Sequence, residues 1–217
     1  MRMVVALVVT VLQAAAGEIV RFDRCDSGGL PPHWSVAMTH SGRPPGWGLV
    51  KDPSAPGPPC VLAQLSTDST AGRFPLAIWD AAEFRDGEVA VAFKPVAGTV
   101  DQAAGIVWRY RDPNNYYIVR ANALENNVVL YKVLNGVRAS IPPIGLPSRA
   151  YGVKHSIASG HWATLRVTFQ GKVFTVFLNG EKLFAAEDGA IESAGKTGLW
   201  TKADSVTYFD NFEIKQK

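Results

Sequence analysis

Apolar and polar residues alternate with a period of two along most of the chain after residue 86. In the segment 88–94, Val89, Val91 and Phe93 share one face, and polar or small residues occupy the other. This alternation indicates β-strands that bury one face and turn the other toward water. No window long enough for an amphipathic helix combines a 3.6-residue period with a helix cap. The pattern therefore predicts an all-β protein.

Turn signals divide the alternating segments into short strands. Asn135-Gly136 and Asn179-Gly180 are the clearest, because both central positions of a type I′ hairpin turn require positive φ. We expect strands at 19–22, 47–50, 61–65, 76–79, 88–94, 106–110, 116–121, 128–134, 137–141, 165–169, 173–178, 181–186, 198–201 and 206–215. So many short strands joined by tight turns predict a two-sheet antiparallel β-sandwich of the jelly-roll type.

The N-terminus reads as an export signal. Arg2 precedes the apolar stretch 4–12, and the alanines at 14–16 supply the small residues of a cleavage site. A buried first strand is the alternative interpretation of this Val-rich run. No later apolar stretch approaches the ~18–20 residues that a membrane span needs. We therefore expect residues 1–16 to be removed, and residues 17–217 to form one exported β-sandwich domain, periplasmic or extracellular, without a membrane span.

The two cysteines, Cys25 and Cys60, make an even pair in a chain that we expect to be exported. Disulfides persist in oxidising compartments, so the pair predicts a bridge. It would brace the Pro-rich stretch 42–59, which has few ladder bonds of its own, and would stabilise the fold by about 3–4 kcal/mol. Two separate buried thiols are the alternative. Two cysteines are by themselves too few for a structural zinc site.

Composition excludes several classes of protein. Apolar residues make up 47% of the chain and charged residues 19%, and the net charge is +3 at pH 7, which is unlike a disordered chain. The 22 Lys and Arg residues nearly balance the 19 Asp and Glu residues. We therefore expect no nucleic-acid partner and no polybasic contact with a membrane surface.

A recurring pattern of turn and core residues runs through the second half of the chain. It comprises Trp162-x-x-Leu165-x-Val167-x-x-x-Gly171, Val176-x-Leu178-Asn179-Gly180, Gly195-x-x-Gly198-Leu199-Trp200, Tyr208 to Phe212, and upstream Phe84 to Glu88 and Gly105 to Arg109. Over residues 84–215 the chain resembles the concanavalin A-like lectin/glucanase superfamily, particularly its laminin-G-like and 3-keto-disaccharide hydrolase branches. The resemblance implies a concanavalin A-like sandwich associated with carbohydrate.

Two departures from that superfamily bear on activity. The hydrolase branch usually carries Tyr-Glu-x-Gln in one strand, whereas residues 116–120 read Tyr-Tyr-Ile-Val-Arg, without the acid. Laminarinase-type glucanases carry Glu-x-Asp-x-x-Glu, whereas residues 83–88 read Glu-Phe-Arg-Asp-Gly-Glu, with a different spacing. A retaining pair of carboxyl groups must lie about 5–5.5 Å apart, and no well-spaced pair is evident elsewhere.

A sugar site needs flat aromatic rings together with fork-like hydrogen-bond donors. Same-face residues on adjacent strands lie about 5–8 Å apart, so several such side chains can line one groove. The candidates for a ligand groove on a concave sheet face are Arg109, Tyr117, Arg120, Lys132 and Trp200. Aromatic packing within the sheet is the rival interpretation.

Three functions stay open. The first is an exported glycan-binding module, which the missing acid pairs favour. The second is a glycoside-type hydrolase acting on 3-keto-disaccharides or related sugars, whose acid would come from a loop; the candidates are Glu125, Asp101 and His155. The third is a structural envelope domain whose partner is another protein.

The resemblance also implies a structural calcium near the chain ends, and we expect no other cofactor. Asp23, Asp26 and Asp210 would supply oxygen ligands if the first and last strands pair. Capping of turns by these aspartates is the alternative.

Overall fold

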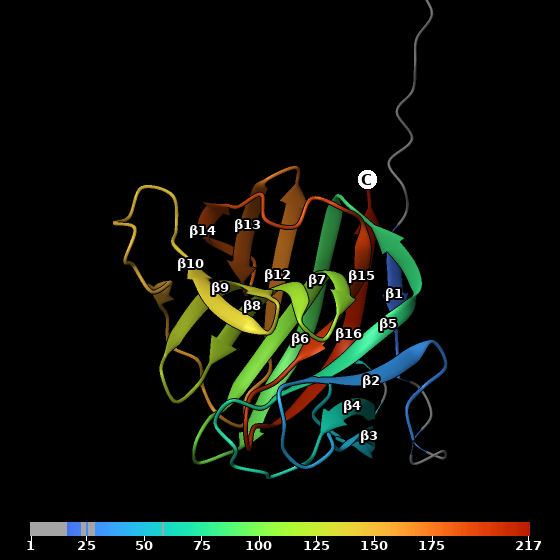
Figure 1. Cartoon of the computed structure of the whole chain (residues 1–217). Helices are drawn as coiled ribbons and strands as arrows, with labels where there is room; N and C mark the ends of the chain where they lie inside the picture. Colours follow the sequence, from blue (N-terminus) through green and yellow to red (C-terminus); the bar gives the residue numbers. More distant parts are fainter. Residues whose placement is uncertain (1–16, 23–24, 26–28, 58) are drawn as a thin grey trace, which may run out of the picture.

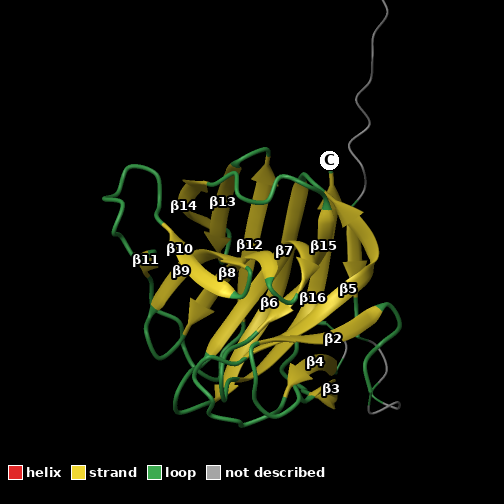
Figure 2. Ribbon diagram, in the orientation of Figure 1, coloured by secondary structure: helices red, strands yellow, loops and turns green. Residues whose placement is uncertain are grey.

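The computed structural model describes residues 17–22, 25, 29–57 and 59–217. Within these residues the chain forms two antiparallel sheets of eight strands each, joined by turns and loops (Figure 1, Figure 2). The prediction of an all-β, two-sheet sandwich is confirmed. In the described residues, no helix has the length and apolar character that crossing a bilayer demands.

The back sheet has the order β14-β13-β12-β6-β16-β4-β3, and β1 pairs with β16. Its strands are β1 (Glu18–Val20), β3 (Trp47–Lys51), β4 (Cys60–Gln64), β6 (Gly87–Ala97), β12 (Ala163–Gln170), β13 (Val173–Leu178), β14 (Glu181–Glu187) and β16 (Val206–Gln216). The first and last described strands therefore lie side by side, as expected.

The front sheet has the order β10-β9-β8-β7-β15-β5-β2, and β11 pairs with β9. Its strands are β2 (Trp34–Thr39), β5 (Phe74–Phe84), β7 (Ala103–Asp112), β8 (Asn115–Asn122), β9 (Asn127–Leu134), β10 (Val137–Ile141), β11 (Val153–Lys154) and β15 (Gly195–Trp200). β2 and β11 were not among the strands predicted from the sequence. Both lie at positions with short or partly exposed patterns, where the alternation is weak.

The two predicted hairpin dipeptides adopt the backbone that their sequence requires. Asn135 and Gly136 have φ of 49° and 81°, and they join β9 to β10. Asn179 and Gly180 have φ of 50° and 83°, and they join β13 to β14. These turns fix the register of each hairpin, and therefore which face each following side chain occupies.

The main core lies between the sheets. Val89, Val91 and Phe93 of β6 pack there against residues of the front sheet such as Ile106 and Trp108, and all five are buried. The same alternation leaves Ala90 and Ala92 on the outer face of the back sheet.

The front sheet has a second buried face, which corrects the expectation that each sheet turns one face to water. This concave face is filled by its own cluster: Phe74, Leu76, Ile78, Ala103, Val107, Tyr116, Ile118, Val129, Tyr131, Val133 and Trp200. The sheet is curved enough to bring its edges together. Thr39 at the end of β2 shares a 2.7 Å hydrogen bond with the Tyr116 hydroxyl, and His40 Nε2 lies 2.8 Å from the Gly136 carbonyl beside β10.

The predicted disulfide between Cys25 and Cys60 is present, with the two Cα atoms 5.6 Å apart. It ties the N-terminal segment to the first residue of β4, where Cys60 is buried. The predicted signal segment, residues 1–16, lies outside the described residues.

Candidate functional site

The five residues expected to line a ligand groove lie in three separate places. Arg109 of β7 is buried and has a φ of 48°. Its guanidinium donates to the carbonyls of Arg85 (2.9 Å), Ile191 (2.8 Å) and Gly171 (2.6 Å). It also lies 3.3 Å from Asp86. Arg109 therefore connects three turns at one end of the sandwich.

Tyr117 and Lys132 meet at the loop between β14 and β15. The Tyr117 hydroxyl donates to Asp188 at 2.7 Å, and Lys132 Nζ donates to the other carboxylate oxygen at 2.6 Å. Burial alone would raise the pKa of the Asp188 carboxyl, but these bonds outweigh it and hold that pKa below its usual range. Tyr117 lies in the core between the sheets, so this group anchors a loop rather than lining an open groove.

Trp200 lies on the concave face but is fully buried. Its ring centroid lies 5.2 Å from that of Phe74, and the Arg138 guanidinium covers it at 5.9 Å. Arg120, the last of the five candidates, also lies on the concave face. Unlike Trp200, it lies beside a side chain that reaches solvent, that of Tyr151.

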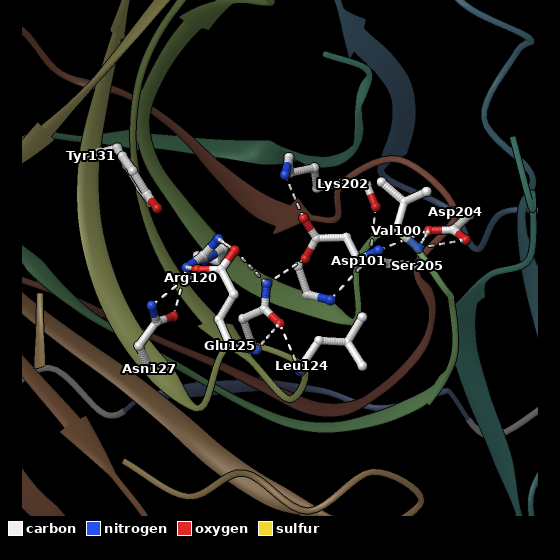
Figure 3. Close-up of polar contacts among 12 residues, drawn as sticks. Val100, Asp101, Arg120, Leu124, Glu125, Asn127, Tyr131, Lys202, Asp204 and Ser205 are labelled. Atoms are coloured by element: carbon white, nitrogen blue, oxygen red, sulfur yellow. Dashed lines mark hydrogen bonds and ion pairs between the residues drawn. The ribbon is translucent and has the colours of Figure 1, made fainter. Parts of the chain in front are cut away.

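Arg120 organises a polar cluster at the end of β8 (Figure 3). Its side chain is fully buried, and it donates two hydrogen bonds to Glu125, at 3.0 and 2.8 Å, and one to Asn127 at 2.6 Å. The turn between β8 and β9 presents Glu125 in this position. Asn122 Oδ1 accepts from the backbone of Leu124 and Glu125, which closes the turn.

The same cluster brings together two of the candidate acids. The Asn122 side-chain amide donates to Asp101 and, at 3.3 Å, to Glu125. Lys202 lies 2.5 Å from the other oxygen of Asp101. Asp204 holds the segment before Asp101 by accepting from backbone N–H groups at 2.7 to 3.1 Å.

The electrostatics of Glu125 bear on catalysis. Burial alone would raise the pKa of its carboxyl, but the hydrogen bonds and charge of Arg120 outweigh that effect and lower the pKa. A general acid at neutral pH needs a raised pKa instead. The third candidate, His155, lies near the same turn, since its backbone N–H donates to the Asn126 carbonyl at 3.1 Å; its ring contacts Ser156 of its own segment.

Two tyrosines and a second arginine extend the cluster along the concave face. Tyr131 and Tyr151 are hydrogen-bonded through their hydroxyls, and Tyr151 keeps 48% of its surface exposed. Arg120 Cζ lies 5.6 and 5.9 Å from the two ring centroids, and Arg138 Cζ lies 4.5 Å from the Tyr131 centroid. We call Arg120, Glu125, Tyr131, Arg138 and Tyr151 the concave site.

Arg138 and Tyr151 were not among the site residues predicted from the sequence. A signal for Arg138 was available, because the Asn135-Gly136 hairpin pairs Arg138 with Val133 and so places it on the face of Tyr131. Tyr151 follows a Pro-rich loop, and no local pattern indicates which face of the sandwich that loop covers.

Two buried donors in the concave site have no hydrogen-bond partner in the described part of the chain. They are Arg120 Nε and Arg138 Nη1. Nearly all buried polar groups in proteins are hydrogen-bonded, so each exception needs an explanation. Both atoms are shielded from solvent, so a ligand can reach them only after side chains of the site move.

The outer face of the back sheet carries a groove of about 460 Å³, which we call the outer groove. Ala90, Ala92, Trp162 and Glu213 help to line it, with an ion-paired group in which Glu88 contacts both Arg166 and Lys215; the remaining lining residues are Pro56, Ala163, Thr164, Asn179 and Asn211. None of these residues has a buried side-chain polar atom without a partner among the described residues. That absence distinguishes the outer groove from the concave site.

Of the three aspartates predicted to bind calcium, only Asp210 is among the described residues. Asp23 and Asp26 lie outside the described residues. Asp210 accepts hydrogen bonds from the backbone of Gly57 and Asn211, both at 2.8 Å. Among the described residues, no three or more His, Cys, Asp or Glu side chains are grouped to hold a metal ion. The calcium site therefore stays a prediction.

Comparison with known families and structures agrees with this fold. The family model described as a 3-keto-alpha-glucoside-1,2-lyase-like domain matches residues 34–215. No curated protein matches the sequence. The match confirms the resemblance to the 3-keto-disaccharide hydrolase branch.

Solved structures share the fold at low sequence identity. The carbohydrate-binding module CBM66 from Bacillus subtilis matches with a TM-score of 0.62 and 17% identity, over 85% of this chain and 96% of that one. A Bacillus subtilis protein of unknown function with a galectin-like fold gives 0.53 and 14%, over 84% and 89%. Domain 4 of the extracellular GH43 arabinanase AbnA from Geobacillus stearothermophilus, in complex with arabinotriose, gives 0.52 and 13%, over 94% and 83%.

Proposed function

The chain belongs to the family of 3-keto-alpha-glucoside-1,2-lyase-like domains, and from that premise we propose that it is an exported glycan-binding module whose ligand contacts the concave site. Two structures of similar fold support the ligand class. One is a carbohydrate-binding module, and the other is an arabinanase domain in complex with arabinotriose.

The observation that carries the proposal is the exposed ring of Tyr151 in the same site as the partly exposed guanidinium of Arg138, which has no hydrogen-bond partner among the described residues. A sugar presents an apolar ring face and several hydroxyl groups. The half-exposed Tyr151 offers a surface for the ring face, and the Glu125 carboxylate, 38% exposed, offers an acceptor for hydroxyl protons. Arg138 Nε and Nη2, which have no partner among the described residues and are not fully buried, offer donors.

Glycoside-type hydrolysis is the second candidate function, and the ion pair of Glu125 argues against it. Two charge-assisted hydrogen bonds to Arg120 keep this carboxyl ionised at neutral pH, so it is better suited to accept hydrogen bonds than to protonate a leaving group. Asp101, the other acid of the cluster, is buried against Lys202.

The proposed location is outside the cytoplasm. The Cys25–Cys60 disulfide supports export, because such bonds persist in oxidising compartments. Cell fractionation that recovers the mature chain, beginning near residue 17, from the periplasm or the medium would distinguish the two locations.

A glycan array followed by calorimetry tests the function. Tyr151→Ala removes the exposed ring and should weaken glycan binding about ten-fold, because aromatic contacts of this kind contribute on the order of 1 kcal/mol beyond the area buried. Trp162→Ala in the outer groove is the matched control, and it should leave affinity unchanged.

Three results would contradict the proposal, and each would favour a different alternative. No binding of any glycan at millimolar concentration would favour the protein-interaction alternative. Binding lost in Trp162→Ala but not in Tyr151→Ala would move the site to the outer groove. Turnover of 3-keto-glucosides that disappears in Glu125→Gln would make the protein an enzyme.

A further inference from the structure

We infer that Arg138 makes the concave site selective for acidic sugars, by pairing with the carboxylate of a uronate unit. This inference rests on the proposed glycan-binding function and names its ligand class. It is carried by the surroundings of one guanidinium group.

The Arg138 guanidinium lies over three aromatic rings of the concave face. Its Cζ atom is 4.5 Å from the centroid of Tyr131, 4.8 Å from that of Phe74 and 5.9 Å from that of Trp200. Contacts of this kind stabilise a cation and hold its plane in a fixed orientation. The hairpin register supports the same position, because Arg138 pairs with Val133 of β9.

No oxygen of the described residues accepts a hydrogen bond from the Arg138 guanidinium. In contrast to Arg138, the three fully buried arginines all donate hydrogen bonds to oxygens of the chain. Arg73 donates to the carbonyls of Arg43, Pro44 and Ala203, while Arg109 and Arg120 each donate to several oxygens. Arg138 also has no Asp or Glu partner within ion-pair distance among the described residues.

The accessibility of the group fits an external partner. Arg138 is only partly buried, and of its guanidinium nitrogens Nη1 alone is both buried and without a partner. Nε and Nη2 have no partner either, but unlike Nη1 they are not fully buried, so they reach solvent. The edge of the fork formed by Nε and Nη2 is thus free.

A carboxylate is the ligand group that this fork fits best. Guanidinium and carboxylate form two parallel charge-assisted hydrogen bonds, which neutral hydroxyl groups cannot reproduce. The neighbouring arginine does not compete for the ligand's charge, because Glu125 already neutralises Arg120. The exposed ring of Tyr151 lies in the same site, through its contacts with Tyr131 and Arg120, and would take the apolar face of the same or the next sugar.

Paired acidic and neutral ligands test the inference. The probes are tetragalacturonate and a glucuronate-bearing xylo-oligosaccharide, each measured by calorimetry beside its methyl ester and beside the best neutral glycan from the array. For the better uronate, the acid should bind at least ten-fold more tightly than its ester. In Arg138→Gln the ratio of acid to ester affinity should fall close to one, and in Arg138→Lys, which keeps the charge without the fork, it should be intermediate.

Arg149→Gln is the matched control, since it removes one positive charge from an exposed position in the loop before Tyr151. It should leave the ratio unchanged. If Arg138→Gln fails to fold, the ratio in the wild-type protein and in Arg138→Lys still decides the matter. Equal affinities of acid and ester in the wild type, or an unchanged ratio in a folded Arg138→Gln, would overturn the inference while neutral glycan binding stands. Absence of all glycan binding would overturn the proposed function itself.

Discussion

Arg109→Met tests the conclusion that a buried arginine of β7 holds turns together instead of contacting a ligand. The substitution keeps a side chain of similar length but removes every hydrogen bond to the carbonyls of Arg85, Gly171 and Ile191. It also removes the ion pair with Asp86, which is partly exposed and therefore contributes little.

The expected loss follows from the three carbonyl acceptors. An unsatisfied buried acceptor costs about 1–3 kcal/mol, and the turns at the end of the sandwich give water some access, so the lower half of that range applies. The free energy of unfolding should fall by about 3–6 kcal/mol in total. In a domain of this size that corresponds to a decrease in Tm of roughly 6–24 °C.

Urea unfolding, followed by the fluorescence of the buried tryptophans, measures this loss. Arg111→Met is the control, because Arg111 lies on the same strand but is exposed and has one weak contact, to Ser193 at 3.3 Å. It should cost less than about 0.5 kcal/mol. A loss below about 1 kcal/mol for Arg109→Met at an unchanged m-value, or a loss of glycan affinity in the folded variant, would refute the reasoning.

Further predictions concern the disulfide and acid stability. Replacing Cys25 and Cys60 with serine should lower the free energy of unfolding by about 4 kcal/mol, the loop-closure value for a separation of 35 residues, and the same denaturant midpoint in both proteins would contradict this. The pKa values of Glu125 and Asp188 are lowered in the folded state, so their contribution is fully present above their unfolded values of 4.5 and 3.8 and is lost as pH falls through the lower folded values. The Tm should therefore be flat from about pH 6 to 7 and decrease below about pH 4. Asp188→Asn should make that decrease shallower, and an equally steep decrease would show that Asp188 is not part of it.

Local features of the sequence determined the class of fold and much of its framework. Alternation along 88–94 identified the residues of β6 that enter the core, since the strand period of two is a property of the chain itself. The Asn-Gly dipeptides identified two hairpins, because their positive φ values are set by residue type. The pairing of Cys25 with Cys60 followed from there being two cysteines in a chain whose N-terminal pattern predicts export.

The sites depended on which face of a sheet curves inward, and alternation alone carries no information about curvature. Trp200 and Arg120 are both on the concave face of the front sheet, yet Trp200 is sealed beneath Arg138 while Arg120 lies beside the exposed ring of Tyr151. Arg138 lies near Phe74 and Trp200 only because the curved sheet brings β10 over residues of β5 and β15, far away in sequence. The alternation thus assigned each side chain to one of two faces. Only packing between distant strands decided which of those side chains reach solvent, and therefore which of them a ligand can contact.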